Sequence, residues 1–155
     1  MSDKIFDYKD RVRENTPETD NQEIDQQIEK SVESYARKSN EEISKRIAEL
    51  GREWDIERVL ESNASILALT GLLLANRNKR WLFLSAVVLA FLLQHAIQGR
   101  CPPIPFFRKL KIRTRQEIDK ERYALKVLRG DFDKIADISS IDTEDKPGYA
   151  LDAVK

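Results

Sequence analysis

Two apolar runs lie back to back in the middle of a chain in which 35% of the residues are charged. The runs cover residues 64–75 and 81–97, and the short basic link 76–80 joins them. No Asp or Glu occurs between Ser62 and Gln116, although the chain carries 27 acidic residues. Helices that are apolar on nearly every face need apolar surroundings. The segregation therefore predicts a helical hairpin in a membrane.

The alternative is a hairpin buried in the core of a soluble protein. Against it, the flanking segments contain too few apolar side chains to cover two such helices. The second run has seventeen residues, and the first reaches that length only when it is extended back to Val59. Seventeen helical residues measure about 25 Å, against about 30 Å for the hydrocarbon core. We expect short spans at about 59–75 and 81–97, and a hairpin that dips in without crossing stays open.

Charge is sorted along the chain. Residues 1–55 carry 10 basic and 15 acidic side chains, whereas residues 76–115 carry 9 basic and none that are acidic. Cations beside apolar runs suit anionic lipid headgroups, each Lys or Arg contributing about 1 kcal/mol. Because no basic stripe lies apart from the apolar segment, we expect membrane lipids as partners and no nucleic acid. More cations flank the hairpin than lie in its link, which places both termini in the cytoplasm.

The N-terminal part divides into two regions. Residues 1–20 show no sustained hydrophobic period, so we expect them to be disordered. In residues 21–56 apolar side chains recur at steps of three and four, which predicts one long amphipathic, coiled-coil-like helix. Its apolar stripe has a period of eleven residues and could pair with a second copy or lie on lipid. The remaining alternative is a solvated stalk with a thin apolar seam.

Three regions follow the hairpin. Residues 100–113 mix basic and aromatic side chains, which is typical of a segment at the membrane interface. Thr114 and Glu117 have the spacing of a capping box, which predicts a helix over 114–130. Residues 131–155 form an acidic tail that we expect to be flexible. The predicted ligands of lipid headgroups are Arg108, Lys109, Lys111 and Arg113.

Small residues recur at steps of three and four on one face of each apolar run. They are Ala64, Ala68, Gly71 and Ala75 in the first run and Ala86 and Ala90 in the second. In lipid, helices associate through close backbone approach. We therefore expect the two stripes to face each other or a second copy, and the protein to be a homo-oligomer.

The reactive side chains fall at one depth of the hairpin. Glu61 and His95 are each seventeen residues from Asn78, and Cys101 lies just beyond. The interpretation we favour is a set of interfacial side chains that bind each other, headgroups and water. The alternative is a proton-handling or thiol site in which nearby cations activate Cys101 and His95 acts as a base. One His and one Cys are too few for a metal site, and we expect no cofactor and no enzymatic activity.

The stretch from Glu57 to Phe132 resembles a known family. Its second apolar run into LLQHAIQGRCPP, followed by RTRQEIDKERYALKVLRGDF, is similar to the YgaP-like two-helix inner-membrane domain of bacteria. The resemblance implies a bacterial inner-membrane protein whose hairpin self-associates. Some family members carry a cytoplasmic rhodanese domain, a sulfurtransferase, before the hairpin. Here a charged helical segment without a rhodanese active-site loop occupies that place, and Arg100 replaces the expected aromatic residue before the Cys, which argues against sulfur transfer.

Together these features predict an all-α fold: two short transmembrane helices in a hairpin over 57–99, a long amphipathic helix before it and a shorter helix after it. The predicted function is that of a small membrane scaffold without enzymatic activity, which self-associates and recruits a cytoplasmic partner through residues 21–55. One alternative is a membrane redox or sulfur-relay accessory that uses Cys101. The other is a peripheral lipid-binding protein whose hairpin never crosses the membrane.

Overall fold

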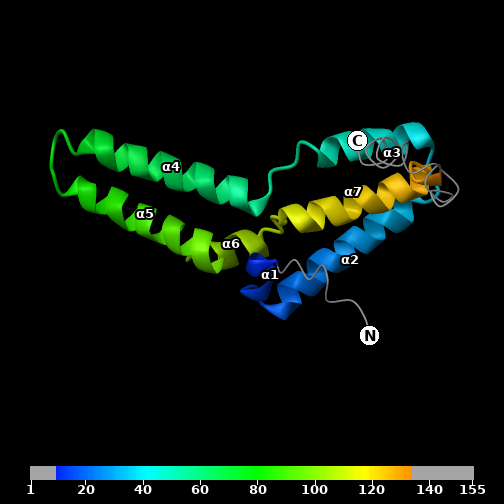
Figure 1. Ribbon diagram of the computed structural model, residues 1–155, viewed down its shortest axis with the longest axis horizontal. Helices are drawn as coiled ribbons and strands as arrows, with labels where there is room; N and C mark the ends of the chain where they lie inside the picture. The colour runs from blue at the N-terminus through cyan, green and yellow to red at the C-terminus, as the bar shows by residue number, and fades with distance from the viewer. Residues whose placement is uncertain (1–9, 134–155) are drawn as a thin grey trace, which may run out of the picture. The chain divides into compact units, whose positions relative to one another are not determined.

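The computed structural model describes residues 10–133, and all regular secondary structure in that range is α-helical (Figure 1). The predicted all-α class is therefore confirmed for the described residues. Most of the expected acidic tail and the first nine residues lie outside them. The helices are α1 (Arg11–Glu14), α2 (Glu18–Tyr35), α3 (Asn40–Leu50), α4 (Ile56–Leu74), α5 (Trp81–Gln98), α6 (Ile104–Lys109) and α7 (Arg115–Arg129).

The described chain divides into two compact units. The hairpin unit contains residues 10–27 and 54–118, and the three-helix unit contains residues 28–53 and 119–133. Helices α2 and α7 contribute residues to both units.

The predicted disorder is wrong for residues 10–20, which form α1 and the start of α2. Asp10 caps α1, because its Oδ1 accepts hydrogen bonds from the N–H groups of Val12 (3.0 Å) and Arg13 (3.1 Å). Such a cap satisfies N–H groups that the first turn leaves unpaired. Val12 is only 3% exposed. A local cap and one buried side chain thus order a segment that has no hydrophobic period.

The prediction of a single helix over 21–56 is also wrong, because α2 ends at Tyr35 and a separate helix, α3, begins at Asn40. Ser39 and Glu42 form a capping box at the new start. Ser39 Oγ accepts from the Glu42 N–H (3.4 Å), and the Glu42 carboxylate accepts from the Ser39 N–H (3.1 Å). A box of this kind specifies a helix N-terminus. Ser39 is therefore the N-cap of a second helix.

Because α2 and α3 are separate helices, Ile28, Ile43 and Leu50 of the apolar stripe lie in the core of the three-helix unit. Glu121 on α7 is fully buried there and accepts hydrogen bonds from Ser31 Oγ (2.6 Å) and Arg46 Nε (3.1 Å). Because Ile28, Ile43 and Leu50 of this stripe are buried within the chain, these three side chains are not available to a second copy or to a lipid surface. The buried apolar residues of this unit, each no more than 2% exposed, are Ile28, Ile43, Leu50 and Leu125.

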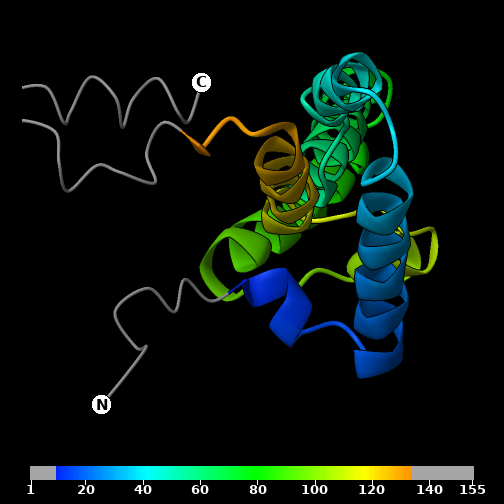
Figure 2. The same cartoon turned by 90° about the vertical axis from the view of Figure 1, so that its right-hand side faces the viewer.

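Helices α4 and α5 run antiparallel side by side and form the predicted hairpin (Figures 1 and 2). They contain 19 and 18 residues, so each is about 27–28 Å long. Among the described helices, α5 alone is long and apolar enough to cross a membrane, and only 6% of it is buried. The first two turns of α4 carry Glu57, Arg58 and Glu61.

The small-residue stripe of α4 faces α5, as the spacing predicted. Ala64, Ala68 and Gly71 are buried, whereas Ala75 is half-buried. A Cβ atom at Gly71 would collide with Ser85 Oγ and lie 3.0 Å from the carbonyl oxygen of Trp81. This close approach needs a glycine on α4.

Of the two alternatives for the stripe of α5, contact with α4 is wrong, because Ala86 and Ala90 are exposed. Ser85, one residue earlier and 4% exposed, occupies the contact position instead. Its Oγ donates a hydrogen bond to the carbonyl oxygen of Ala68 (2.9 Å), which satisfies the buried hydroxyl. Successive residues of a helix are about 100° apart around its axis. Ala86, one residue after the contact position Ser85, therefore points away from α4. The stripe remains open to lipid or to a second copy.

Replacing Gly71 by Ile should destabilise the hairpin by about 1–3 kcal/mol, because the added side chain overpacks the contact with Ser85. Replacing Ala90 by Ile adds the same kind of bulk at an exposed position and should leave the stability of the single chain within about 0.5 kcal/mol. Thermal unfolding of both variants in mild detergent checks this. Equal stability of the two variants would contradict the assigned contact.

Candidate functional site

The part of the hairpin unit away from the link forms a polar and apolar assembly that we call the hairpin base. It contains α1, α6 and the adjoining ends of α2, α4, α5 and α7. Val12 of α1, Ile56 of α4 and Ile104 of α6 form its buried core. The partly buried side chains that pack against this core are Cys101, Phe107 and Ile112.

Gly99 fixes the end of α5 against α1. Its φ of 68° lies in the left-handed region, which favours glycine. A Cβ atom there would lie 2.5 Å from the Cβ of Arg11. Arg11 Nη1 donates to the carbonyl oxygens of Ala96 (2.8 Å) and Ile97 (3.3 Å), placing a cation at the C-terminus of the helix. Gly99 therefore terminates α5 and also allows α1 to pack closely against its end.

A buried ion cluster joins α1, α2, α6 and α7. Arg108 is fully buried, and its Nη1 and Nη2 donate to the two carboxylate oxygens of Glu117, each at 2.7 Å. Arg13 Nη1 donates to the same carboxylate at 2.7 Å. Arg108 Nη2 also donates to Asn21 Oδ1 (2.8 Å), and Arg13 Nη2 donates to Asp25 Oδ2 (2.7 Å). Bidentate, charge-assisted bonds of this kind are the strongest in proteins.

The cluster corrects the predicted headgroup ligands. Arg108 and Arg113 are 0% and 8% exposed, so their guanidinium groups cannot meet lipid phosphates. Lys111 pairs with Glu23 of α2, whereas Lys109 is exposed. The prediction is wrong for both arginines. For Arg108 the reason is that Glu117, predicted only to cap a helix, is buried and binds its guanidinium group.

The capping box predicted at the start of α7 is present. Thr114 Oγ1 accepts from the Glu117 N–H (3.3 Å), and Glu117 Oε2 accepts from the Thr114 N–H (2.8 Å). Burial by itself raises the pKa of Glu117, but the hydrogen bonds from Arg108 and Thr114 and the charges of Arg108 and Arg13 outweigh it. The pKa of Glu117 therefore lies below its ordinary value.

A polar cavity of about 710 Å³ opens beside the cluster. Glu61 and His95 both line it, as their equal distance from Asn78 predicted. His95 Nδ1 is buried and has no hydrogen-bond partner among the described residues. Over the same residues, no group of three or more His, Cys, Asp or Glu side chains is arranged to hold a metal ion. The other charged side chains that line the cavity are Asp10, Arg11, Glu57 and Arg115.

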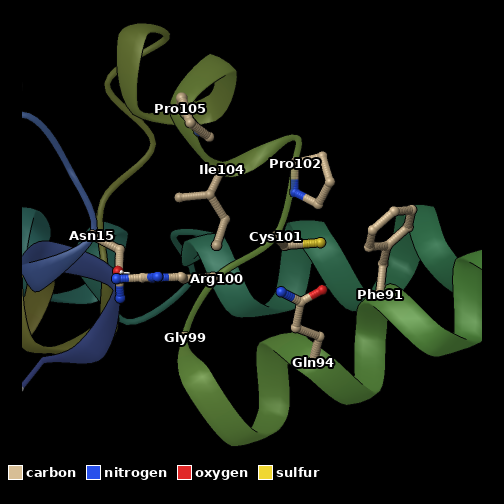
Figure 3. Close-up of a pocket in the computed structure, with 9 residues that line it drawn as sticks. All are labelled: Asn15, Phe91, Gln94, Gly99, Arg100, Cys101, Pro102, Ile104 and Pro105. Carbon is tan, nitrogen blue, oxygen red and sulfur yellow. Dashed lines mark hydrogen bonds between the residues drawn. The ribbon is translucent and has the colours of Figure 1, made fainter.

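Cys101 lines a second cavity, of about 470 Å³ (Figure 3). Phe91 and Gln94 lie on the same side of this cavity as the sulfur, whereas the side chain of Arg100 extends toward Asn15, whose Oδ1 accepts from Arg100 Nε at 2.5 Å. Burial raises the pKa of the Cys101 thiol, which opposes the expected activation by nearby cations. Cys101 and His95 line different cavities. The geometry therefore offers little support for a thiolate and its base.

Comparison with protein-family models, curated proteins and solved structures finds no match for this chain. The resemblance of residues 57–132 to the YgaP-like domain therefore stays a prediction from the residues themselves.

The lowered pKa of Glu117 predicts a stability that depends on pH. The contribution of this carboxylate should be complete above its unfolded pKa of about 4.5 and should be lost as the pH falls through the lower folded value. Replacing Glu117 by Gln leaves Arg108 buried without its counter-charge and should cost about 3–5 kcal/mol at pH 7. Replacing the exposed Glu33 by Gln is the control. Urea unfolding at pH 7 and pH 4 should show a smaller acid-dependent loss in Glu117→Gln than in the control.

The raised pKa of Cys101 predicts a poorly reactive thiol at neutral pH. Iodoacetamide should alkylate the folded chain with a pH midpoint above that of the same chain unfolded in urea. A midpoint below that of the unfolded chain would instead support the sulfur-relay hypothesis.

Proposed function

We propose that the chain is a small integral protein of the bacterial inner membrane that acts as a scaffold without enzymatic activity. The observation that carries the proposal is the outward display of large apolar side chains around the hairpin. Their exposed fractions run from 41% to 74%. They are Ile66, Leu67, Leu69, Leu72 and Leu73 on α4 and Trp81, Leu82, Phe83, Leu89, Phe91, Leu93 and Ile97 on α5.

Lipid accounts for this surface better than water does. Burying one large apolar side chain is worth about 1.5–3 kcal/mol, and soluble monomers rarely expose patches beyond a few hundred Å². The lengths of α4 and α5 approach the roughly 30 Å of the hydrocarbon core. Charged side chains lie at both ends of the hairpin, in the link at 76–80 and at the base. Two spans return the chain to its starting side. The base carries more Lys and Arg residues than the three in the link, which supports cytoplasmic termini.

Two surfaces support the interaction part of the proposal. The exposed Ala86 and Ala90 leave α5 a face on which a second copy can approach closely. A cytoplasmic partner that binds residues 21–55 would contact their exposed surface, because Ile28, Ile43 and Leu50 are buried whereas Trp54 is 50% exposed. Helix α7 offers a second apolar surface. On α7, Tyr123, Val127 and Leu128 are 39%, 61% and 41% exposed.

Membrane fractions washed with alkaline carbonate should retain the full chain, because lipid surrounds the hairpin. Release into the supernatant would favour the peripheral alternative and contradict the proposal. For topology, Asn78→Cys and Glu41→Cys are compared in a Cys101→Ser background. In intact cells whose outer membrane has been permeabilised, an impermeant maleimide should label position 78 and spare position 41. Protection of both positions would indicate a hairpin that dips in from the cytoplasmic side.

A further inference from the structure

Helix α6 presents an apolar edge that the hairpin base does not cover. Phe106 and Leu110 lie four residues apart and are 62% and 57% exposed, with Lys109 exposed beside them. The opposite side of the helix holds Ile104 and Arg108, which are 2% and 0% exposed. The inner side is therefore fixed by the core and the ion cluster, while residues 10–133 leave Phe106 and Leu110 on the outer side largely uncovered.

The packing of α6 places this edge at one end of the hairpin. Ile104 shares a buried core with Ile56, which is the first residue of α4. Helix α6 also follows the end of α5 after a turn of five residues, 99–103. Since α4 is about 28 Å long, a link at one surface of a bilayer puts α6 at the other surface.

The charge of this region favours an anionic surface. No acidic residue occurs between Ser62 and Gln116, and the carboxylate of Glu117 is paired with Arg108 in the buried cluster. Lys109 is an exposed cation within the edge itself. An aromatic ring, an aliphatic side chain and a lysine together match the boundary between acyl chains and headgroups.

We propose that the outer side of α6, formed by Phe106, Lys109 and Leu110, docks into the surface of an anionic phospholipid bilayer and anchors the hairpin base there. This inference rests on the proposed membrane-spanning hairpin. Lipid is chosen as the occupant because α6 follows α5 after only five residues, and the large apolar side chains of α5 face outward.

Spin labels on single cysteines in the Cys101→Ser background test the proposal in the full chain. The protein is reconstituted in phosphatidylcholine vesicles with or without about one third phosphatidylglycerol, and label depth is measured from accessibility to oxygen and to a nickel chelate. With phosphatidylglycerol present, a label at Leu110 should lie about 5–10 Å into the headgroup region. A label at Leu72 should lie deeper, and a label at Glu41 should remain in water.

The outcomes separate this inference from the proposed function. A Leu72 label in water would overturn the membrane-spanning hairpin itself. A Leu72 label in lipid with a Leu110 label in water would overturn the docking of α6 alone, and would leave the edge to a protein partner. Lys109→Glu should move the Leu110 label toward water, whereas the matched variant Lys45→Glu in α3 should not. A Leu110 depth that is the same with and without phosphatidylglycerol would overturn the role of anionic lipid.

Discussion

The buried carboxylate of Glu117 is the group on which the hairpin base depends. It caps α7 through Thr114 and accepts hydrogen bonds from Arg108 of α6 and Arg13 of α1. A buried charge is tolerated only when its partners are close and its remaining lone pairs are satisfied. Separating α6 from α7 would leave buried charge without its counter-charge, because Arg108 and Glu117 are 0% and 2% exposed. The cluster therefore couples segments that are 104 residues apart in sequence.

The hairpin itself is held by a different kind of interaction. Between α4 and α5 the contact rests on the absence of a side chain at Gly71 and on one hydroxyl, that of Ser85, satisfied by a backbone carbonyl. If lipid surrounds these helices, hydrophobic burial adds little between them, and close packing must supply the attraction. Charged groups are concentrated at the base and in the link, where water is available to those that are unpaired. Close packing therefore holds the part of the hairpin that would lie in lipid, whereas ion pairs and hydrogen bonds hold the base, which would be reached by water.

The features that could be predicted from the sequence are those with local signals. The all-α class, the hairpin limits, Gly99 as a helix end and the capping box at Thr114 each depend on a few neighbouring residues. The capping box at Ser39 has the same spacing as the one at Thr114 and could have been predicted in the same way. The eleven-residue apolar period instead indicated one continuous helix. The burial of Arg108 depends on residues of α1, α2 and α7 that meet only in three dimensions. The exposure of Ala86 and Ala90 depends likewise on how α5 is rotated against α4.

Burial of the apolar stripe changes what the chain can offer to other molecules. Once Ile28, Ile43 and Leu50 are enclosed within the three-helix unit, a coiled coil built on them would require that unit to unfold. Among the described residues, the large apolar side chains that remain exposed lie on the hairpin, on the outer side of α6, on α7 and at Trp54. The first two belong to the same unit and both suit lipid. Under the proposed function, a soluble partner would bind exposed surface outside the hairpin, and the hairpin would anchor the chain in the membrane.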